Sequence, residues 1–112
     1  MLITKKFRFE AAHRLDKYNG KCENLHGHSY VLEVSFTGEP KEDGMIMDFE
    51  YIKNIVNERI IQKLDHKLLN DLIPIATCEN IAKWIWNELQ DYKPYEIKLF
   101  ETIDSWITYN GK

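Results

Sequence analysis

Residues 28–36 read HSYVLEVSF, and from the third residue onward every second side chain is large and apolar. The apolar positions are Tyr30, Leu32, Val34 and Phe36. This two-residue period is typical of a β-strand that buries one face. Residues 2–9 repeat the pattern, because Ile3, Phe7 and Phe9 alternate with polar side chains. The sequence therefore predicts two half-buried strands, one at residues 2–9 and one at residues 28–36.

Two amphipathic helices are predicted further along the chain. The first begins after Asp48, a residue type favoured at the N-cap, and continues to Leu64. Its apolar residues recur with helical spacing at Phe49, Ile52, Ile55, Val56, Ile60 and Leu64. Thr77 is the expected N-cap of the second helix, and Pro94 ends that segment. The second helix carries Ile81, Ile85 and Leu89 on one face.

Two further strands are expected after the second helix, at residues 95–99 and 106–109, with a short turn between them. The predicted order is strand, strand, helix, helix, strand, strand. This order indicates an α+β fold in which two helices cover one face of a four-stranded antiparallel sheet. The other face and the sheet edges would remain uncovered, so we expect a homo-oligomer. The 112 residues fit a single domain spanning residues 1–112.

Composition and charge argue against several classes of protein. The chain is 44% hydrophobic and 29% charged, as in ordinary globular proteins, and its net charge of −3 argues against a nucleic-acid partner. No apolar run approaches the ~20 residues of a membrane span, and Met1 leads directly into a strand pattern. We therefore expect a cytoplasmic protein. Basic residues crowd the first part of the chain, which would suit either a small anion or a solvated strand edge.

The sequence His26-Gly27-His28 is the clearest chemical signal. Side chains at i and i+2 of an extended segment point to the same face, so both imidazoles can converge on one ion. His28 shares the parity of the apolar side of its strand, and His13 shares the parity of the apolar side of residues 2–9. Pairing the two strands would therefore bring three imidazoles together. Three neutral imidazoles suit zinc, with the fourth coordination position open to a substrate.

Cys22 leaves two other arrangements open. It could be a fourth ligand beside the three histidines, which would close a structural zinc site without catalytic function. Alternatively, Cys22 and His66 could be the nucleophile and base of a hydrolase, although the three histidines would then have no function. A disulfide between Cys22 and Cys78 is not expected in a chain without a secretion signal.

Three further side chains are candidates for proton transfer or ligand binding. Asp65 and His66 adjoin at the end of the first helix, where a turn would let the carboxylate orient the imidazole. They could equally be the charged end of a surface helix. Glu101 shares the parity of Ile97 and Leu99, so its carboxylate should be partly buried and need a donor. A ligand with a guanidine-like edge would supply paired donors, unless this position is merely a strand end.

Several separated motifs occur along the chain in one order. They are FEAAHRL at residues 9–15, then Cys22, His26, Gly27 and His28, Asp48-Phe49, LDH at residues 64–66, Leu69-Asn70, TCEN at residues 77–80, and Glu101. Together these motifs resemble the 6-pyruvoyl-tetrahydropterin synthase and 6-carboxytetrahydropterin synthase family over nearly the whole chain. The three residues between Cys22 and His26 resemble the bacterial 6-carboxytetrahydropterin synthases of the queuosine pathway, since the tetrahydrobiopterin enzymes usually have a longer gap there.

The resemblance implies a tunnelling fold of ββααββ order. In that fold, four-stranded sheets join edge to edge into an oligomeric barrel with the helices outside. It also implies a homohexamer whose active sites lie at subunit interfaces. A small chain would in this way obtain a deep pocket by sharing its walls with a neighbour.

The resemblance also implies functions for individual residues. The zinc ligands would be His13, His26 and His28, and Cys22 would be the catalytic proton acceptor. Asp65 and His66 would form a proton relay, Glu101 would anchor the pterin ring, and Thr77 and Glu79 would help to line its pocket. The chain departs from the family here, because Ala76 and Cys78 flank Thr77 where the family often has Pro before it and Ser or Ala after it.

The implied reaction converts 7,8-dihydroneopterin triphosphate to 6-carboxy-5,6,7,8-tetrahydropterin, acetaldehyde and triphosphate. Zinc is the implied cofactor, and neither a nicotinamide nor a flavin is needed, because the ring gains the reducing equivalents that its side chain loses. A 6-pyruvoyl-tetrahydropterin synthase or a related pterin side-chain activity is the alternative. Arg14, Lys17 and Lys21 are candidate contacts for the triphosphate.

Overall fold

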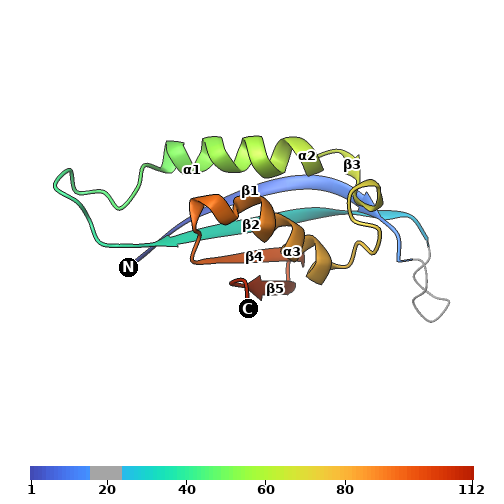
Figure 1. Ribbon diagram of the computed structural model, residues 1–112. Coiled ribbons are helices and arrows are strands. Elements are labelled where there is room, and N and C mark those ends of the chain that lie inside the picture. Colours follow the sequence, from blue (N-terminus) through green and yellow to red (C-terminus); the bar gives the residue numbers. More distant parts are fainter. Residues whose placement is uncertain (16–23) are drawn as a thin grey trace.

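The computed structural model describes residues 1–15 and 24–112. Five strands form one sheet in the order β3-β1-β2-β4-β5 (Figure 1). They are β1 (Leu2–His13), β2 (His26–Thr37), β3 (Lys67–Leu68), β4 (Glu96–Thr102) and β5 (Ser105–Tyr109). The four longer strands lie where alternation predicted them, and β1 and β2 both extend further than expected, to the histidines at their ends.

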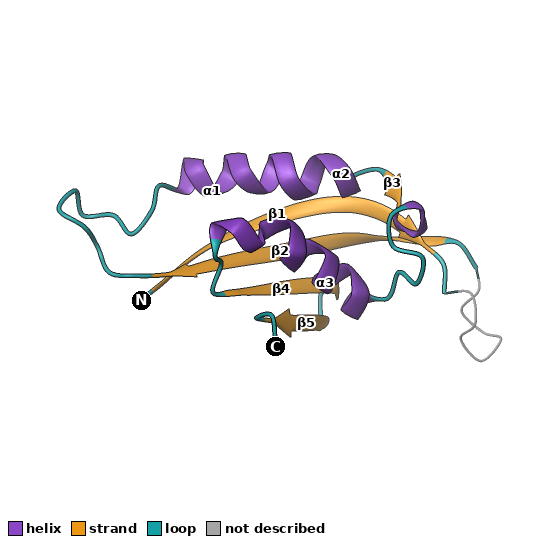
Figure 2. Ribbon diagram, viewed as in Figure 1, coloured by secondary structure: helices purple, strands orange, loops and turns teal. Residues whose placement is uncertain are grey.

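The helices lie on one face of this sheet, as predicted (Figure 2). The first is a continuous rod made of α1 (Phe49–Val56), a π-helical segment (Asn57–Ile61) and α2 (Gln62–Leu64). The second is α3 (Cys78–Leu89). Both predicted N-caps are confirmed, because Asp48 accepts a hydrogen bond from Glu50 N at 2.8 Å and Thr77 accepts one from Asn80 N at 3.1 Å.

The hydrophobic core fills the space between the helices and the face of the sheet that they cover. We call this the inner face of the sheet. Its strands contribute Phe7, Phe9, Ala11, Tyr30, Leu32, Val34, Phe36, Ile97 and Leu99 to the core. The helices contribute Ile52, Ile55, Val56, Ile60, Leu64, Ile81, Ala82, Ile85 and Leu89. Residues with the opposite strand parity form the uncovered outer face, where Lys6, Arg8 and Glu10 are exposed.

The expectation of a purely antiparallel, four-stranded sheet was wrong. Strand β3 pairs with Ala11 and Ala12 of β1 in the parallel direction, so the sheet is mixed and has a fifth strand. Two residues are too few to show a periodic pattern, which explains why the sequence did not reveal β3. The pairing matters for the site, because β3 follows Asp65 and His66 directly and holds them beside β1.

Within the described residues, both sides of the sheet end in unpaired backbone: most of β1 on the side away from β2, and all of β5 on the side away from β4. β3 covers only two residues of β1, and β5 pairs on one side with β4. Such rows of unpaired N–H and C=O groups are ready to pair with another strand. No helix among the described residues is long and apolar enough to cross a membrane.

Candidate metal centre

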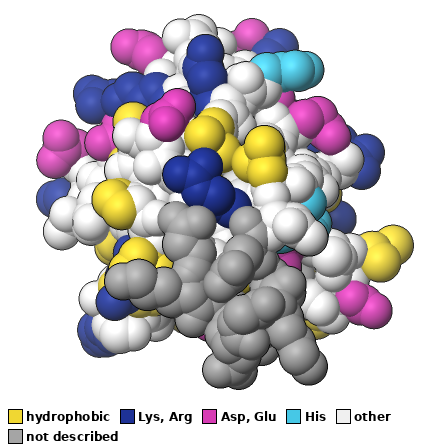
Figure 3. Space-filling view, turned by 90° about the vertical axis from the view of Figure 1, so that its right-hand side faces the viewer, with side chains coloured by type: hydrophobic (Ala, Val, Ile, Leu, Met, Phe, Trp, Pro, Cys, Tyr) yellow, Lys and Arg dark blue, Asp and Glu magenta, His cyan; other side chains and the backbone are white. Residues whose placement is uncertain are grey.

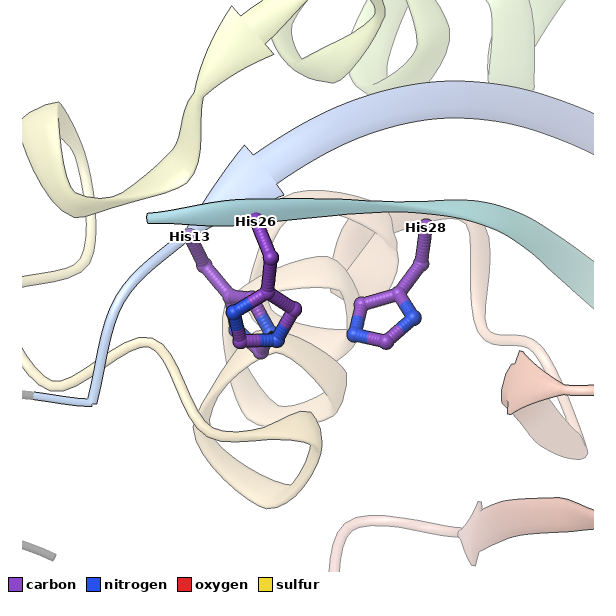
Figure 4. Close-up of side chains that lie close together, drawn as sticks. All are labelled: His13, His26 and His28. Carbon is purple, nitrogen blue, oxygen red and sulfur yellow. Dashed lines mark hydrogen bonds between the residues drawn. The ribbon is translucent and has the colours of Figure 1, made fainter. Parts of the chain in front are cut away.

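The pairing of β1 with β2 places three histidines on the inner face. His13 lies opposite His26, and Ala11 lies opposite His28, without a register shift between the strands. All three side chains therefore leave the same side of the sheet and point toward one another (Figure 4). Gly27 permits the close strand approach, because an added Cβ would lie 3.3 Å from the carbonyl oxygen of Ala11. The parity argument from sequence is confirmed at all three positions.

Hydrogen bonds at the Nδ1 atoms orient two of these rings. His13 Nδ1 donates to the carbonyl oxygen of Ala76 at 2.7 Å, and His26 Nδ1 donates to that of Asn24 at 2.9 Å. Neutral rings that carry their proton on Nδ1 have a bare lone pair on Nε2. The two Nε2 atoms lie only 3.1 Å apart, and two facing lone pairs repel unless a cation lies between them.

His28 completes the cluster from the next inner-face position of β2, two residues after His26. Its Nε2 atom is buried and has no hydrogen-bond partner among the described residues. Burial lowers the pKa of His28, Glu101 opposes that shift, and the neighbouring His13 and His26 reinforce it. The neutral form that is favoured is also the form that binds metals.

The three rings fit a tetrahedral metal ion. Their ligand atoms all lie within 4.8 Å of one another. With zinc–nitrogen bonds of ~2.0–2.1 Å, two ligands of a tetrahedral ion are roughly 3.3 Å apart, close to the separation of the His13 and His26 Nε2 atoms. Three imidazoles from the protein leave one tetrahedral position, which a substrate or another side chain could take.

Glu101 is brought to the edge of this cluster. Its Oε2 lies 3.9 Å from His13 Nε2, and its side chain is 30% exposed. The register between β4 and β5 shifts between Phe100 and Thr102, which places Glu101 at an irregularity of the strand. Such irregularities change the direction of a side chain next to functional sites. The expectation of a partly buried carboxylate at Glu101 is therefore confirmed.

Cys22, Lys17 and Lys21 lie outside the described residues. The other cysteine, Cys78, is a free thiol at the start of α3, and its Sγ donates to the carbonyl oxygen of Leu99 at 3.5 Å. Burial raises the pKa of Cys78 from 9.0 to about 12, and the negative charges of Glu101 and Glu79 add to this effect. At neutral pH Cys78 is therefore a protonated thiol, which is a poor proton acceptor.

Cys78 should consequently react slowly with thiol reagents. The pKa shift from 9.0 to about 12 lowers its thiolate fraction roughly 1000-fold. We expect a Cys22→Ala variant to react with iodoacetamide at pH 8 at least ~100-fold more slowly than free cysteine, and to reach the free-cysteine rate when unfolded in urea. Mass spectrometry of timed samples measures both rates. Fast labelling of the folded variant would show that Cys78 is an accessible thiolate.

Asp65 and His66 form the pair that the sequence predicted, but they face the outer side of the sheet. His66 has a φ of 59°, and this left-handed turn brings its Nδ1 to 3.0 Å from Asp65 Oδ2. Glu10 fixes the turn, because its N–H donates to Asp65 Oδ1 at 2.9 Å and its carbonyl accepts from His66 N at 2.6 Å. The bond from Glu10 N–H is the main cause that lowers the pKa of Asp65, so the carboxylate is ionised beside the imidazole.

His66 is not brought to the metal cluster of its own chain. Its side chain is 79% exposed and makes no ring contact or hydrogen bond with the three histidines in the described part of the structure. It instead borders a surface cleft of about 530 Å³ whose walls include Glu10, Gly27 and Ser29. The backbone of Ala11 and His28 borders this cleft as well, but the bond from His66 N to the Glu10 carbonyl places His66 beside an outer-face residue of β1, so the relay pair lies on the face opposite the metal cluster.

Thr77 and Glu79 both lie at the start of α3. The Thr77 hydroxyl is engaged as the N-cap of α3, and Glu79 is exposed on the first turn of that helix. Neither residue lines the two clefts that contain Gly27, one of which also includes Glu101. The structure therefore gives Thr77 a clear role in starting the helix.

Sequence reasoning did not identify the carbonyl groups of Ala76 and Asn24, which orient two of the rings. Backbone acceptors carry no residue-type signal, so no pattern could have revealed them. The end of the molecule that carries the cluster shows imidazole side chains among charged groups at the surface (Figure 3). Of the three cluster residues, His26 is exposed and His13 is buried, so the ligand set reaches from the core to the solvent.

The chain is similar to proteins of known name over nearly its whole length. A family described as 6-pyruvoyl tetrahydropterin synthase matches residues 2–112. The 6-pyruvoyl tetrahydrobiopterin synthase of Dictyostelium discoideum is 38% identical over 132 aligned positions, which cover 100% of this chain and 97% of that protein. The 6-carboxy-5,6,7,8-tetrahydropterin synthase of Synechocystis is 36% identical over 118 positions, covering 96% of this chain and 92% of the relative.

The fold gives the same result as the sequences. The structure of a 6-pyruvoyl tetrahydropterin synthase from Caenorhabditis elegans superposes with a TM-score of 0.90 at 27% identity, and the match covers 100% of this chain and 96% of that one. The three-histidine cluster is consistent with the metal site of this family. Sequence, fold and ligand set agree, and the chain is a member of the 6-pyruvoyl tetrahydropterin synthase family.

Proposed function

We propose that this protein is a zinc-dependent lyase of queuosine biosynthesis. It would convert 7,8-dihydroneopterin triphosphate and one molecule of water to 6-carboxy-5,6,7,8-tetrahydropterin, acetaldehyde and triphosphate. The observation that carries the proposal is the cluster of His13, His26 and His28. The Nε2 atoms of His13 and His26 face each other at 3.1 Å, and that of His28 is buried without a hydrogen-bond partner among the described residues. A site built from three protein imidazoles is typical of catalytic rather than structural zinc.

The product assignment is supported by the spacing between Cys22 and His26, which is three residues. A 6-pyruvoyl-tetrahydropterin synthase is the second candidate. It is supported by the relative from Dictyostelium discoideum, whose 38% identity is close to the 36% of the 6-carboxy relative from Synechocystis.

Each candidate residue has a defined task in the proposed reaction. A zinc ion held by the three histidines would polarise the side-chain hydroxyl groups of the substrate and lower their pKa. Cys22 would remove a proton from the side chain next to the pterin ring. His66, oriented by Asp65 at 3.0 Å, would transfer a second proton. Glu101 would accept paired hydrogen bonds from the guanidine-like edge of the ring.

The position of His66 supports an assembly in which subunits share their sites. Because Asp65 and His66 face the outer side of the sheet, they would act on substrate bound at a neighbouring copy of the chain. The open edges of β1 and β5 support the same conclusion, since strands of neighbouring copies could pair there. We propose a homohexameric barrel with interfacial active sites, formed by the single domain 1–112 in the cytoplasm.

The decisive experiment is incubation of the zinc-loaded protein with 7,8-dihydroneopterin triphosphate. We expect 6-carboxy-5,6,7,8-tetrahydropterin and an equal amount of acetaldehyde, identified by chromatography with mass spectrometry. A 6-pyruvoyl product without acetaldehyde would establish the second candidate instead. Unchanged substrate in the presence of bound zinc would contradict both activities.

Substitution of Glu101 should weaken substrate binding while leaving the metal in place. Glu101→Gln removes the charge but keeps the size of the side chain, and the amide offers the pterin only one acceptor. Loss of a charge-assisted hydrogen bond costs ~1.5–3 kcal/mol, so we expect kcat/KM to fall ~10–100-fold. Steady-state kinetics together with the zinc content of the purified variant test this.

Glu58→Gln is a matched control for the Glu101 variant. Glu58 is an exposed carboxylate in the π-helical segment of the rod and belongs neither to the histidine cluster nor to the two clefts that contain Gly27, so its neutralisation should leave kcat/KM unchanged. If Glu101→Gln and Glu58→Gln have the same kinetics as the unmodified protein, Glu101 does not anchor the ring.

A further inference from the structure

The Leu69-Asn70 motif has no function in the site described above, yet Asn70 is tied closely to a metal ligand. Asn70 lies in a 3-10 turn (Leu69–Asp71) directly after β3. Its Oδ1 accepts from Arg14 N at 2.9 Å, and its Nδ2 donates to Arg14 O at 3.0 Å and to Pro74 O at 3.1 Å. One side chain thus connects the end of β1 with the segment that leads to α3.

The two bonds to Arg14 hold the main chain next to His13. The ladder between β1 and β2 ends at the pair of His13 and His26, so it does not fix the residue that follows. The amide group of Asn70 takes the place of a neighbouring strand there, because it accepts from the N–H and donates to the C=O of the same residue. These bonds limit rotation of the backbone at the C-terminal side of the ligand.

The third bond acts on the ring of the same histidine. His13 Nδ1 donates to the carbonyl oxygen of Ala76, only two residues after Pro74, whose carbonyl Asn70 holds. Asn80 fixes the residue between them, since its Nδ2 donates to Ile75 O at 2.8 Å. Segment 74–76, which carries the carbonyl that accepts the His13 hydrogen bond, is therefore held by side-chain hydrogen bonds, and Asn70 fixes its position relative to β1.

We propose that Asn70 is a positioning residue for the metal ligand His13. It couples the backbone of His13 to the carbonyl that orients the ring, and so directs Nε2 at the ion. This inference rests on the metal site proposed above. Partners in the outer shell of a metal site typically change affinity ~10–100-fold when they are removed.

The test measures metal binding directly and does not depend on turnover. Asn70→Ala removes all three bonds, whereas Asn70→Asp keeps the size and the acceptor for Arg14 N but loses both donated bonds. Zinc affinity is obtained by competition with a chromophoric chelator, and ligand geometry from the visible absorption bands of the Co²⁺-loaded protein. We expect zinc to bind ~10–100-fold more weakly to both variants, with altered Co²⁺ bands at saturation.

Asp48→Ala controls for a general loss of stability. The Asp48 side chain also holds main chain, because it accepts a hydrogen bond from Glu50 N. Asp48 lies at the start of the helical rod, about 24 Å from the rod's other end at Leu64 if each residue adds 1.5 Å. The control should lower Tm while zinc affinity and the Co²⁺ bands stay unchanged. Wild-type affinity and bands in both Asn70 variants would overturn the inference. Failure of the unmodified protein to bind zinc would instead overturn the proposed metal site.

Discussion

A His28→Ala variant is expected to fold but to lose its metal and all measurable turnover. His28 supplies one of the three Nε2 atoms, so its removal should reduce zinc affinity by more than the ~100-fold that loss of an outer-shell partner can cost. Without the ion, the substrate hydroxyl groups are no longer polarised, and product formation should fall to background. Zinc analysis after dialysis and product assay at saturating substrate measure the two effects.

His28 is a better ligand for this test than His13, because its substitution disturbs the buried core less. His13 is 1% exposed, so its removal would leave a cavity and confuse loss of metal with loss of structure. His28 Nε2 has no hydrogen-bond partner among the described residues, so no protein hydrogen bond of that atom is lost. Circular dichroism should show an unchanged secondary structure.

His66→Ala provides the matched control for metal binding. It removes the same side chain from the opposite side of the sheet, where the ring is 79% exposed. This variant should bind zinc with unchanged affinity. If His28→Ala keeps its zinc, or if His66→Ala loses it, the assignment of the ligands is wrong.

The second large effect is expected for Cys22→Ala, which should keep its zinc and lose turnover. If Cys22 is the proton acceptor, its removal eliminates general base catalysis, which typically contributes ~10²–10⁴-fold to the rate. We expect kcat to fall by this factor while KM changes little. Stopped assays over several hours can measure the residual rate, and atomic absorption gives the zinc content.

The same variant separates the catalytic site from a closed structural site. If Cys22 were a fourth ligand, the variant would lose zinc and unfold at a lower temperature. Cys78→Ala is the matched control, because that thiol has a pKa raised to about 12 and would not accept a proton at neutral pH. A Cys22→Ala variant with full activity, or an inactive variant without zinc, would each contradict the proposed role of Cys22.

Much of the site could be predicted from the positions of residues within their own strands. His13, His26 and His28 were assigned to one face by parity, and the pairing of His13 with His26 confirms it. Parity works because successive side chains of a strand must point to opposite faces. The N-caps Asp48 and Thr77 could be predicted for a similar reason, since a cap acts on N–H groups two or three residues away.

Other features depend on residues far apart in the sequence. Asp65 and His66 were predicted as a pair, but only their attachment to Glu10 places them on the outer face. The bonds of Asn70 to Arg14 span 56 positions. The acceptor for His13 lies 63 positions away at Ala76. No periodic pattern connects such residues.

The amino-acid order alone established the α+β class, the two buried strand faces and the set of three imidazoles, because these follow from the local geometry of strands and helices. Folding of the whole chain added the parallel strand β3, the side of the sheet that His66 occupies, and the carbonyl groups that orient the rings. Those features arise when the core closes and brings distant backbone groups within hydrogen-bond distance. Local periodicity contains no information about which distant groups will meet.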